Sequence, residues 1–158
     1  MKLAEALLLR ADLQKKIASL RERIVANAVV QEKDKPSEDP AVLMKEAFGA
    51  IDELEALVVK INETNLTAKL ADGRTLTQAI AVRDTLKAQH ALLQAAIAGA
   101  RKEPDRYGVR EIKWVATLPV AKLQKQSDDL SKKIRELNGH LQEANWKTSL
   151  AGSRRGSG

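Results

Sequence analysis

The sequence lacks several of the residues on which catalytic and metal-binding chemistry usually depends. It has no cysteine, which excludes disulfides, thiolate nucleophiles and thiolate metal sites. Its two histidines, His90 and His140, leave little scope for imidazole chemistry. The eight glycines are isolated or lie in the C-terminal tail, so the sequence has no glycine-rich phosphate-binding loop. We therefore predict that the chain is not an enzyme and has no catalytic residues, cofactor or metal.

Long apolar runs and aromatic side chains are also scarce. No apolar run approaches the ~18–20 residues needed to span a bilayer. Glu5, Arg10 and Asp12 interrupt the Leu-rich start, whereas a signal peptide needs an unbroken apolar segment. Only four residues are aromatic, and layered packing of Leu, Ile and Ala between helices does not need more. We expect a soluble, cytoplasmic, mainly helical protein.

Basic residues outnumber acidic ones, but they are too dispersed to indicate nucleic-acid binding. The net charge is +6, and Lys and Glu are interleaved along most of the chain, as on solvated helix surfaces. The excess lies in residues 109–158, which carry 10 basic and 5 acidic side chains. Part of that excess belongs to a Gly/Ser/Arg tail over residues 151–158, which we predict to be disordered. Nucleic acid is therefore not an expected partner.

Four segments have the residue spacing of amphipathic helices. We predict helices over about 2–28, 40–65 and 77–100, and a fourth that begins near Pro119 and continues through Asn138-Gly139 in phase. The second has the widest apolar stripe, which indicates contact with more than one neighbour. Its main positions are Met44, Ala47, Ile51, Leu54, Val58 and Ile61, broadened by Leu43, Phe48, Leu57 and Val59.

Polar residues before the second and third helices are suited to capping them. Ser37 or Asp39 can cap the second helix, with Pro40 in its first turn, and Thr75 or Thr77 can cap the third. The charged, proline-containing residues 31–40 are expected to form a loop.

Two short segments alternate as strands do. Leu66, Ala68 and Leu70 alternate with polar residues before the Asp72-Gly73 turn signal. Residues 109–118 alternate in the same way. We predict a small antiparallel β element formed by residues 66–76 and 110–117.

The fold class that follows is mainly α, with long antiparallel helices forming a bundle or coiled coil in a single domain over residues 1–150. The first and fourth helices have the clearest heptads, so they can pair with each other or with a second copy. The second and third would then form a second pair inside the bundle.

Several apolar residues fall outside the main seam of the first helix. Leu7, Leu9, Val29 and Val30 would be exposed in a monomer, at a cost of about 1.5–3 kcal/mol for each large side chain left unburied. A closed symmetric assembly would cover them. We therefore expect a homo-oligomer, with Leu7, Leu9 and Val30 among its contact residues.

Trp114 and Trp146 are further candidates for contact or assembly. Trp114 shares a face with Ile112 and Leu118, so we expect it to pack the small sheet onto the helices, and stacking on a base or ligand is the alternative. Trp146 ends the last heptad run and is expected to pack against the start of the first helix or against a second copy. No small-molecule ligand can be identified from these positions.

One predicted helix places three possible metal ligands on a common face. Glu136, His140 and Glu143 follow one another at intervals of four and three residues, and borderline metals use such ligands. In the heptad these positions flank the apolar seam, and the Glu-x-x-His pattern of di-iron bundles is not repeated. We interpret them as a solvated helix face.

Several short motifs together resemble a bacterial family of small proteins described as septicolysin-like. They are Ala71-Asp72-Gly73-Arg74-Thr75-Leu76-Thr77, Arg83-Asp84-Thr85-Leu86, Glu111-Ile112-Lys113-Trp114, Leu123-Gln124-Lys125-Gln126-Ser127-Asp128-Asp129-Leu130 and Gln142-Glu143-Ala144-Asn145-Trp146. The resemblance covers about residues 1–150. It implies a pore-forming or cytolytic protein and brings no catalytic residues with it.

Two functional hypotheses remain. The first is a non-enzymatic oligomeric helical protein that acts through self-assembly or partner binding. The alternative is a membrane-acting protein that inserts amphipathic helices, since residues 1–28 combine a Leu/Ile face with Lys15, Lys16, Arg21 and Arg23. A membrane is an expected partner only under this alternative.

Overall fold

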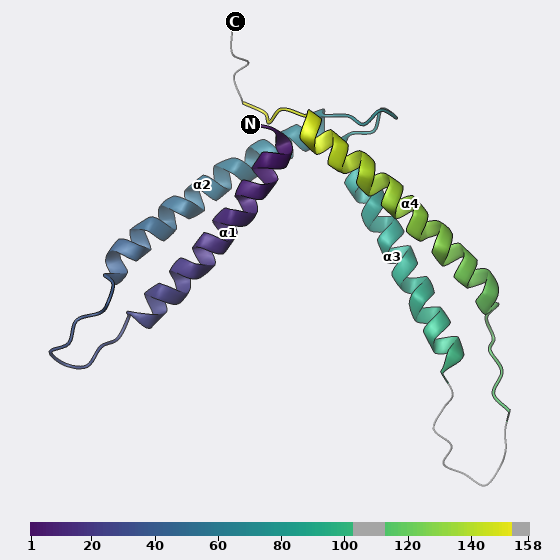
Figure 1. Ribbon diagram of the computed structural model, residues 1–158, viewed down its shortest axis with the longest axis horizontal. Coiled ribbons are helices and arrows are strands. Elements are labelled where there is room, and N and C mark those ends of the chain that lie inside the picture. The colour runs from purple at the N-terminus through teal and green to yellow at the C-terminus, as the bar shows by residue number, and fades with distance from the viewer. Residues whose placement is uncertain (103–112, 153–158) are drawn as a thin grey trace, which may run out of the picture. The chain divides into compact units, whose positions relative to one another are not determined.

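The protein is mainly helical, as its sequence predicts. The computed structural model describes residues 1–102 and 113–152, which contain four α-helices (Figure 1). They are α1 (Leu3–Ala26), α2 (Pro40–Thr67), α3 (Leu76–Arg101) and α4 (Val120–Lys147). The sequence predicts one domain over residues 1–150. Contacts group the chain into two compact units, Met1–Lys69 with Gln142–Gly158 and Leu70–Leu141, and each is described by itself.

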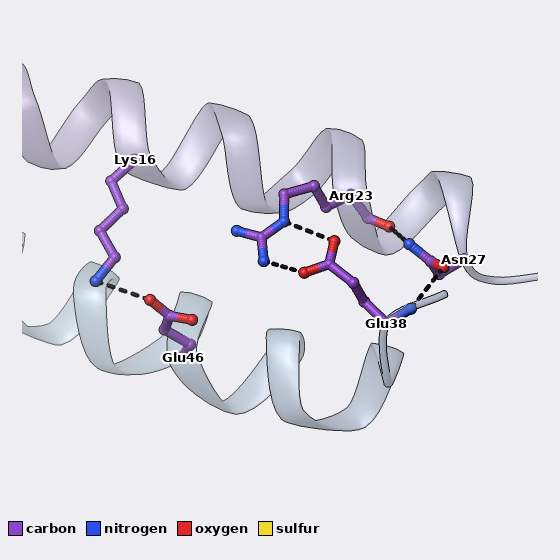
Figure 2. A network of polar contacts seen from close by, with 5 residues as sticks. All are labelled: Lys16, Arg23, Asn27, Glu38 and Glu46. Atoms are coloured by element: carbon purple, nitrogen blue, oxygen red, sulfur yellow. Dashed lines mark hydrogen bonds and ion pairs between the residues drawn. The ribbon is translucent and has the colours of Figure 1, made fainter. Parts of the chain in front are cut away.

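In the first unit, α1 and α2 run antiparallel as a helical hairpin. Leu20 of α1 packs with Leu43 and Ala47 of α2, and Ile24 packs against them. Polar contacts follow one edge of this hairpin (Figure 2). Lys16 forms an ion pair with Glu46 at 2.9 Å, and Arg23 forms a forked pair with Glu38. Contacts that pair later residues of α1 with earlier ones of α2 require the antiparallel orientation.

The loop between α1 and α2 ends at the predicted cap. The Asp39 carboxylate accepts a hydrogen bond from the Ala41 backbone at 2.8 Å, and Pro40 occupies the first turn. Before the cap, the Glu38 backbone donates to the side chain of Asn27, as Figure 2 also shows. These bonds satisfy backbone groups that a helix leaves free at its ends.

In the second unit, α3 and α4 also run antiparallel. Gln94 of α3 donates to the hydroxyl of Ser127 on α4 at 2.6 Å, and His90 is 2.9 Å from the hydroxyl of Ser131. Thr75 caps α3 in a capping box with Gln78. Helix α4 continues through Asn138-Gly139, as predicted.

The predicted β element is wrong for the part of the chain that the structure describes. Leu66 and Thr67 belong to α2, where the Thr67 hydroxyl donates to the carbonyls of Glu63 and Thr64. Too few residues remain for a strand, and residues 68–75 instead make a turn closed by a 2.8 Å bond from Leu70 N to Arg74 O. Gly73 takes the positive φ of 85° that this turn requires. Residues 113–117 form no strand, and 110–112 lie outside the described residues.

The predicted helix pairing also needs correction. Helix α1 packs along α2 and α3 along α4, so each helix pairs with its neighbour in sequence rather than the first with the fourth. Short connections favour this outcome, because a helical hairpin closes with less loss of chain entropy than a long-range pair.

The two ends of the described chain meet in the first unit. Lys2 and Ser149 form an isolated antiparallel bridge, with bonds from Leu3 N to Thr148 O at 2.9 Å and from Leu150 N to Met1 O at 3.0 Å. The Ala151 backbone also donates to the Thr64 hydroxyl at 2.9 Å. Ala151 is therefore part of the fold and not of a disordered tail, and residues 153–158 lie outside the described residues.

The two hairpins repeat one pattern of buried positions. Leu3 and Ala6 of α1 correspond to Leu76 and Ala79 of α3, and all four are almost fully buried. Leu57 and Ile61 of α2 correspond in the same way to Leu137 and Leu141 of α4, and Leu70 corresponds to Leu150. The local bonds repeat as well, because Lys2 N donates to Glu5 as Thr75 N donates to Gln78. Corresponding positions of the two hairpins can therefore be compared directly.

Candidate interaction surface

Helix α2 carries an exposed row of apolar side chains, here called the α2 stripe. Its members lie on one flank of the helix, at the three- and four-residue steps that a helical face requires. They are Met44, Phe48, Ile51, Val59 and Leu66, all classed as exposed. Phe48 and Leu66 keep 59% and 62% of their surface accessible. An exposed apolar row of this length is typical of an interaction surface.

The buried face of α2 is a different one. Leu43, Ala47, Ala50, Leu57, Ile61 and Thr64 are buried. The predicted apolar stripe has Met44 and Ile51 among its main positions, but both are exposed. The second neighbour that the wide apolar surface of α2 predicts stays a prediction. The spacing of apolar residues identifies both apolar faces of α2, but which face α1 covers depends on the tertiary packing.

The second hairpin shows that the fold does not require this stripe. The positions of α4 that correspond to the five stripe residues are Gln124, Asp128, Ser131, Gly139 and Trp146, of which only Trp146 is a large apolar side chain. Gln124 donates to Asp128 at 3.0 Å, and Ser131 contacts His90. Since the same hairpin is built with polar side chains at the first three of these positions, the apolar side chains of α2 are not explained by folding alone.

Charged residues accompany the stripe. Lys45 and Glu63 lie beside its two ends, and both are exposed. Glu55 and Asn62 fall within the row and interrupt its apolar surface. The stripe is therefore interrupted by two polar residues and is flanked by a positive charge at one end and a negative charge at the other.

The assembly residues predicted from the sequence do not lie together on one exposed surface. Leu7 and Leu9 are half-buried in the first unit, so the expectation that a monomer leaves them exposed is wrong. Leu9 faces a cavity with Leu57 and Leu150. Val30 is exposed in the loop after α1, beside the more exposed Val29.

Both tryptophans are largely accessible. Trp114 keeps 65% of its surface exposed, and no strand lies in the described residues for it to pack onto a helix. The predicted role as a plug between sheet and helices is therefore wrong. Trp146, near the end of α4, is 55% exposed. Each remains a candidate contact residue.

A cavity of about 350 Å³ opens in the first unit. Its lining combines the apolar side chains of Leu9, Leu57 and Leu150 with the charged side chains of Glu53 and Lys60. Met1, Ala56, Ala151 and Gly152 complete it. This cavity could not be predicted from the sequence, because its walls come from both ends of the chain and from α2.

Neighbouring arginines lower the pKa of two carboxyl groups. The hydrogen bond from Arg23 lowers the pKa of Glu38, and the hydrogen bonds from Arg74 lower the pKa of Asp72. Both carboxylates are held in the charged form by exposed guanidinium groups. This chemistry is structural, since each carboxylate is already occupied by its arginine.

The residues considered as metal ligands have other neighbours. Glu143 contacts Lys147, and Glu136 lies 4.0 Å from Lys132. Across residues 1–102 and 113–152, no three His, Asp or Glu side chains gather as a metal site would require.

No helix among residues 1–102 and 113–152 has both the length and the apolarity that crossing a membrane requires.

Comparison with known proteins gives a family and a fold. A family model described as a family of unknown function, DUF6847, matches residues 10–150. The chain is similar over 95% of its length to a crystal structure of a functionally unknown conserved protein from Corynebacterium diphtheriae, at 35% identity and a TM-score of 0.89. The match covers 98% of that protein. No curated protein matches. Neither description bears on the septicolysin-like resemblance, which stays a prediction.

Proposed function

The chain belongs to DUF6847, a family of unknown function, and we propose that it is a non-enzymatic helical protein that acts by self-assembly through the α2 stripe. The observation that carries this proposal is the exposed apolar row of α2, of which the corresponding face of α4 keeps only one large apolar side chain, Trp146. The partner that covers this row is the α2 stripe of a second copy of the chain.

The spacing of the stripe supports a two-fold arrangement. In an antiparallel pair of α2 helices centred on Glu55, Met44 lies opposite Leu66 of the second copy, and Ile51 lies opposite Val59. Lys45 then comes close to Glu63 of the second copy, so that two opposite-charge contacts flank the apolar row. A surface that complements itself in this way suits an isologous dimer.

The expected affinity is moderate. Burying the exposed half of a large apolar side chain contributes on the order of 1 kcal/mol. Two stripes together therefore contribute about 10 kcal/mol, which is comparable to the association cost of about 4–15 kcal/mol. The two Glu55 carboxylates meet near the two-fold axis and oppose association. Association is therefore expected to be reversible and to weaken on dilution.

Light scattering on the full chain tests the proposal. The wild type should have about twice the 17.3 kDa mass of one chain at tens of micromolar, and Phe48→Asp with Ile51→Asp should reduce it to one chain. Leu92→Asp is the matched control, because Leu92 is an exposed apolar residue in the middle of α3.

Retention of the dimer by the control and of helical circular dichroism by both variants would support the stripe as the interface. A wild type that stays monomeric at these concentrations overturns the proposal. A monomer that also releases dye from anionic vesicles would favour the membrane-acting alternative.

A further inference from the structure

The cavity of the first unit can be compared with its counterpart in the second, because the hairpin pattern repeats. Lys60 of the cavity corresponds to His140, Leu57 to Leu137 and Leu150 to Leu70. The backbone of Met1 corresponds to that of Arg74, since Leu150 N donates to Met1 O as Leu70 N donates to Arg74 O.

In the second unit, a carboxylate belonging to the chain occupies this place. The Asp72 side chain accepts from the backbone N of Arg74 at 3.0 Å and from the Arg74 guanidinium. Those bonds lower the pKa of Asp72, and the charge of nearby His140 lowers it further. An anionic side chain therefore lies beside the backbone N–H of Arg74 and near His140, the α4 residue that corresponds to Lys60.

The first unit has the Lys60 ammonium and the amino group of Met1 at the corresponding positions but lacks the carboxylate. Gly152 follows Leu150 by two residues, as Asp72 follows Leu70, but it brings no side chain and its backbone conformation differs from that of Asp72. It takes a positive φ of 73°, and a Cβ placed on it would lie 3.8 Å from the Cε of Lys60. Lys60 and Met1 both line the cavity.

We propose that this cavity binds a small monocarboxylate with an apolar tail. The ligand carboxylate lies near the Lys60 ammonium and the amino group of Met1, both of which line the cavity, much as Asp72 lies near His140 in the second unit. The tail lies against Leu9, Leu57 and Leu150. This proposal does not depend on self-assembly, because none of these residues belongs to the α2 stripe.

Glu53 restricts the ligand further. It also lines the cavity, seven residues before Lys60 on α2, which is about 10 Å along a helix. A carboxylate at that end disfavours a second negative charge on the ligand. The cavity therefore selects a single carboxylate at the Lys60 end.

Octanoate is a suitable probe, with octanol and octylamine as controls for charge. Titration followed by amide NMR shifts should show octanoate binding about tenfold or more tightly than octanol, since a hydrogen bond to a charged group contributes a factor of this size. Octylamine should bind no better than octanol. Lys60→Gln should reduce octanoate binding to the level of octanol.

Two variants at Gly152 separate charge from shape. Both Gly152→Asp and Gly152→Asn accept the left-handed backbone better than most residues. Gly152→Asp, which places a carboxylate next to Lys60, should lower octanoate affinity about tenfold relative to Gly152→Asn. Equal affinities in the two variants, or equal binding of octanoate and octanol to the wild type, would overturn the proposal. Light scattering on Lys60→Gln distinguishes ligand binding from self-assembly, because this variant should still form the dimer.

Discussion

At the scale of single residues, polar contacts fix how each hairpin is aligned. In the first hairpin the Arg23–Glu38 pair lies at the edge, next to the loop. In the second, the hydroxyl of the fully buried Ser127 accepts a bond from Gln94 within the helix contact itself. A buried hydroxyl is tolerated only when it is bonded, so this contact favours one alignment of α3 and α4 over others.

The Arg23–Glu38 pair predicts a pH dependence. Because the folded state lowers the pKa of Glu38 below its ordinary value of 4.5, the pair stabilises the fold above that pH. This contribution is lost as the pH falls further, through the folded-state pKa. Glu38→Gln should therefore lower the melting temperature slightly at pH 7 and have less effect at pH 3. The exposed pair is screened by salt, so the difference should shrink at high ionic strength.

Glu32→Gln serves as the control, since Glu32 is exposed in the same loop. Thermal melts by circular dichroism at both pH values provide the measurement. An equal loss of stability in the two variants would show that the Arg23 contact contributes nothing.

At the scale of elements, local signals place the helices well and the β element badly. Asp39 and Thr75 act as the caps that their position before an apolar-periodic segment predicts. The alternation of Leu66, Ala68 and Leu70 failed as a strand signal because α2 continues through Thr67. A three-residue alternation cannot compete with a helix that already has a buried face.

Gly139 gives an element-scale prediction. It lies within α4, and a Cβ placed there would meet no atom within 4 Å. Gly139→Ala should therefore stabilise the protein by about 1 kcal/mol, because alanine loses less backbone entropy in a helix. Gly73→Ala is the opposite control, since its φ of 85° suits glycine and the change should destabilise. Denaturant melts should rank the variants Gly139→Ala, wild type, Gly73→Ala, and the reverse ranking would contradict this reasoning.

At the scale of the whole molecule, the repeated hairpin makes the chain ends equivalent to an internal turn. Met1 and Leu150 are bonded as Arg74 and Leu70 are, although only the second pair is joined by Ala71-Asp72-Gly73. The bridge between Lys2 and Ser149 therefore completes noncovalently what the turn completes within the chain.

A circular permutant tests this equivalence. Replacing residues 152–158 with Asp-Gly, joining that glycine to Met1 and opening the chain between Lys33 and Asp34 should preserve the fold. Lys33 is a suitable site because its positive φ of 77° is relieved by cutting the loop. The permutant should keep its helical circular dichroism and melt within about 5 °C of the wild type. Loss of cooperative melting would show that the two connections are not equivalent.

The sequence by itself determined the helices, because spacing, caps and breaks such as Asp39-Pro40 are local and act within a few residues. Its wide apolar stripe on α2 also predicts a second neighbour for that helix, which stays a prediction. The sequence did not determine which helices pair or which flank of α2 stays exposed, since Met44 and Leu43 are equally apolar and differ only in what packs against them. The cavity beside Lys60 was beyond sequence reasoning for the same reason. Its walls come from residues as distant as Leu9 and Leu150, which only the closure of the two chain ends brings together.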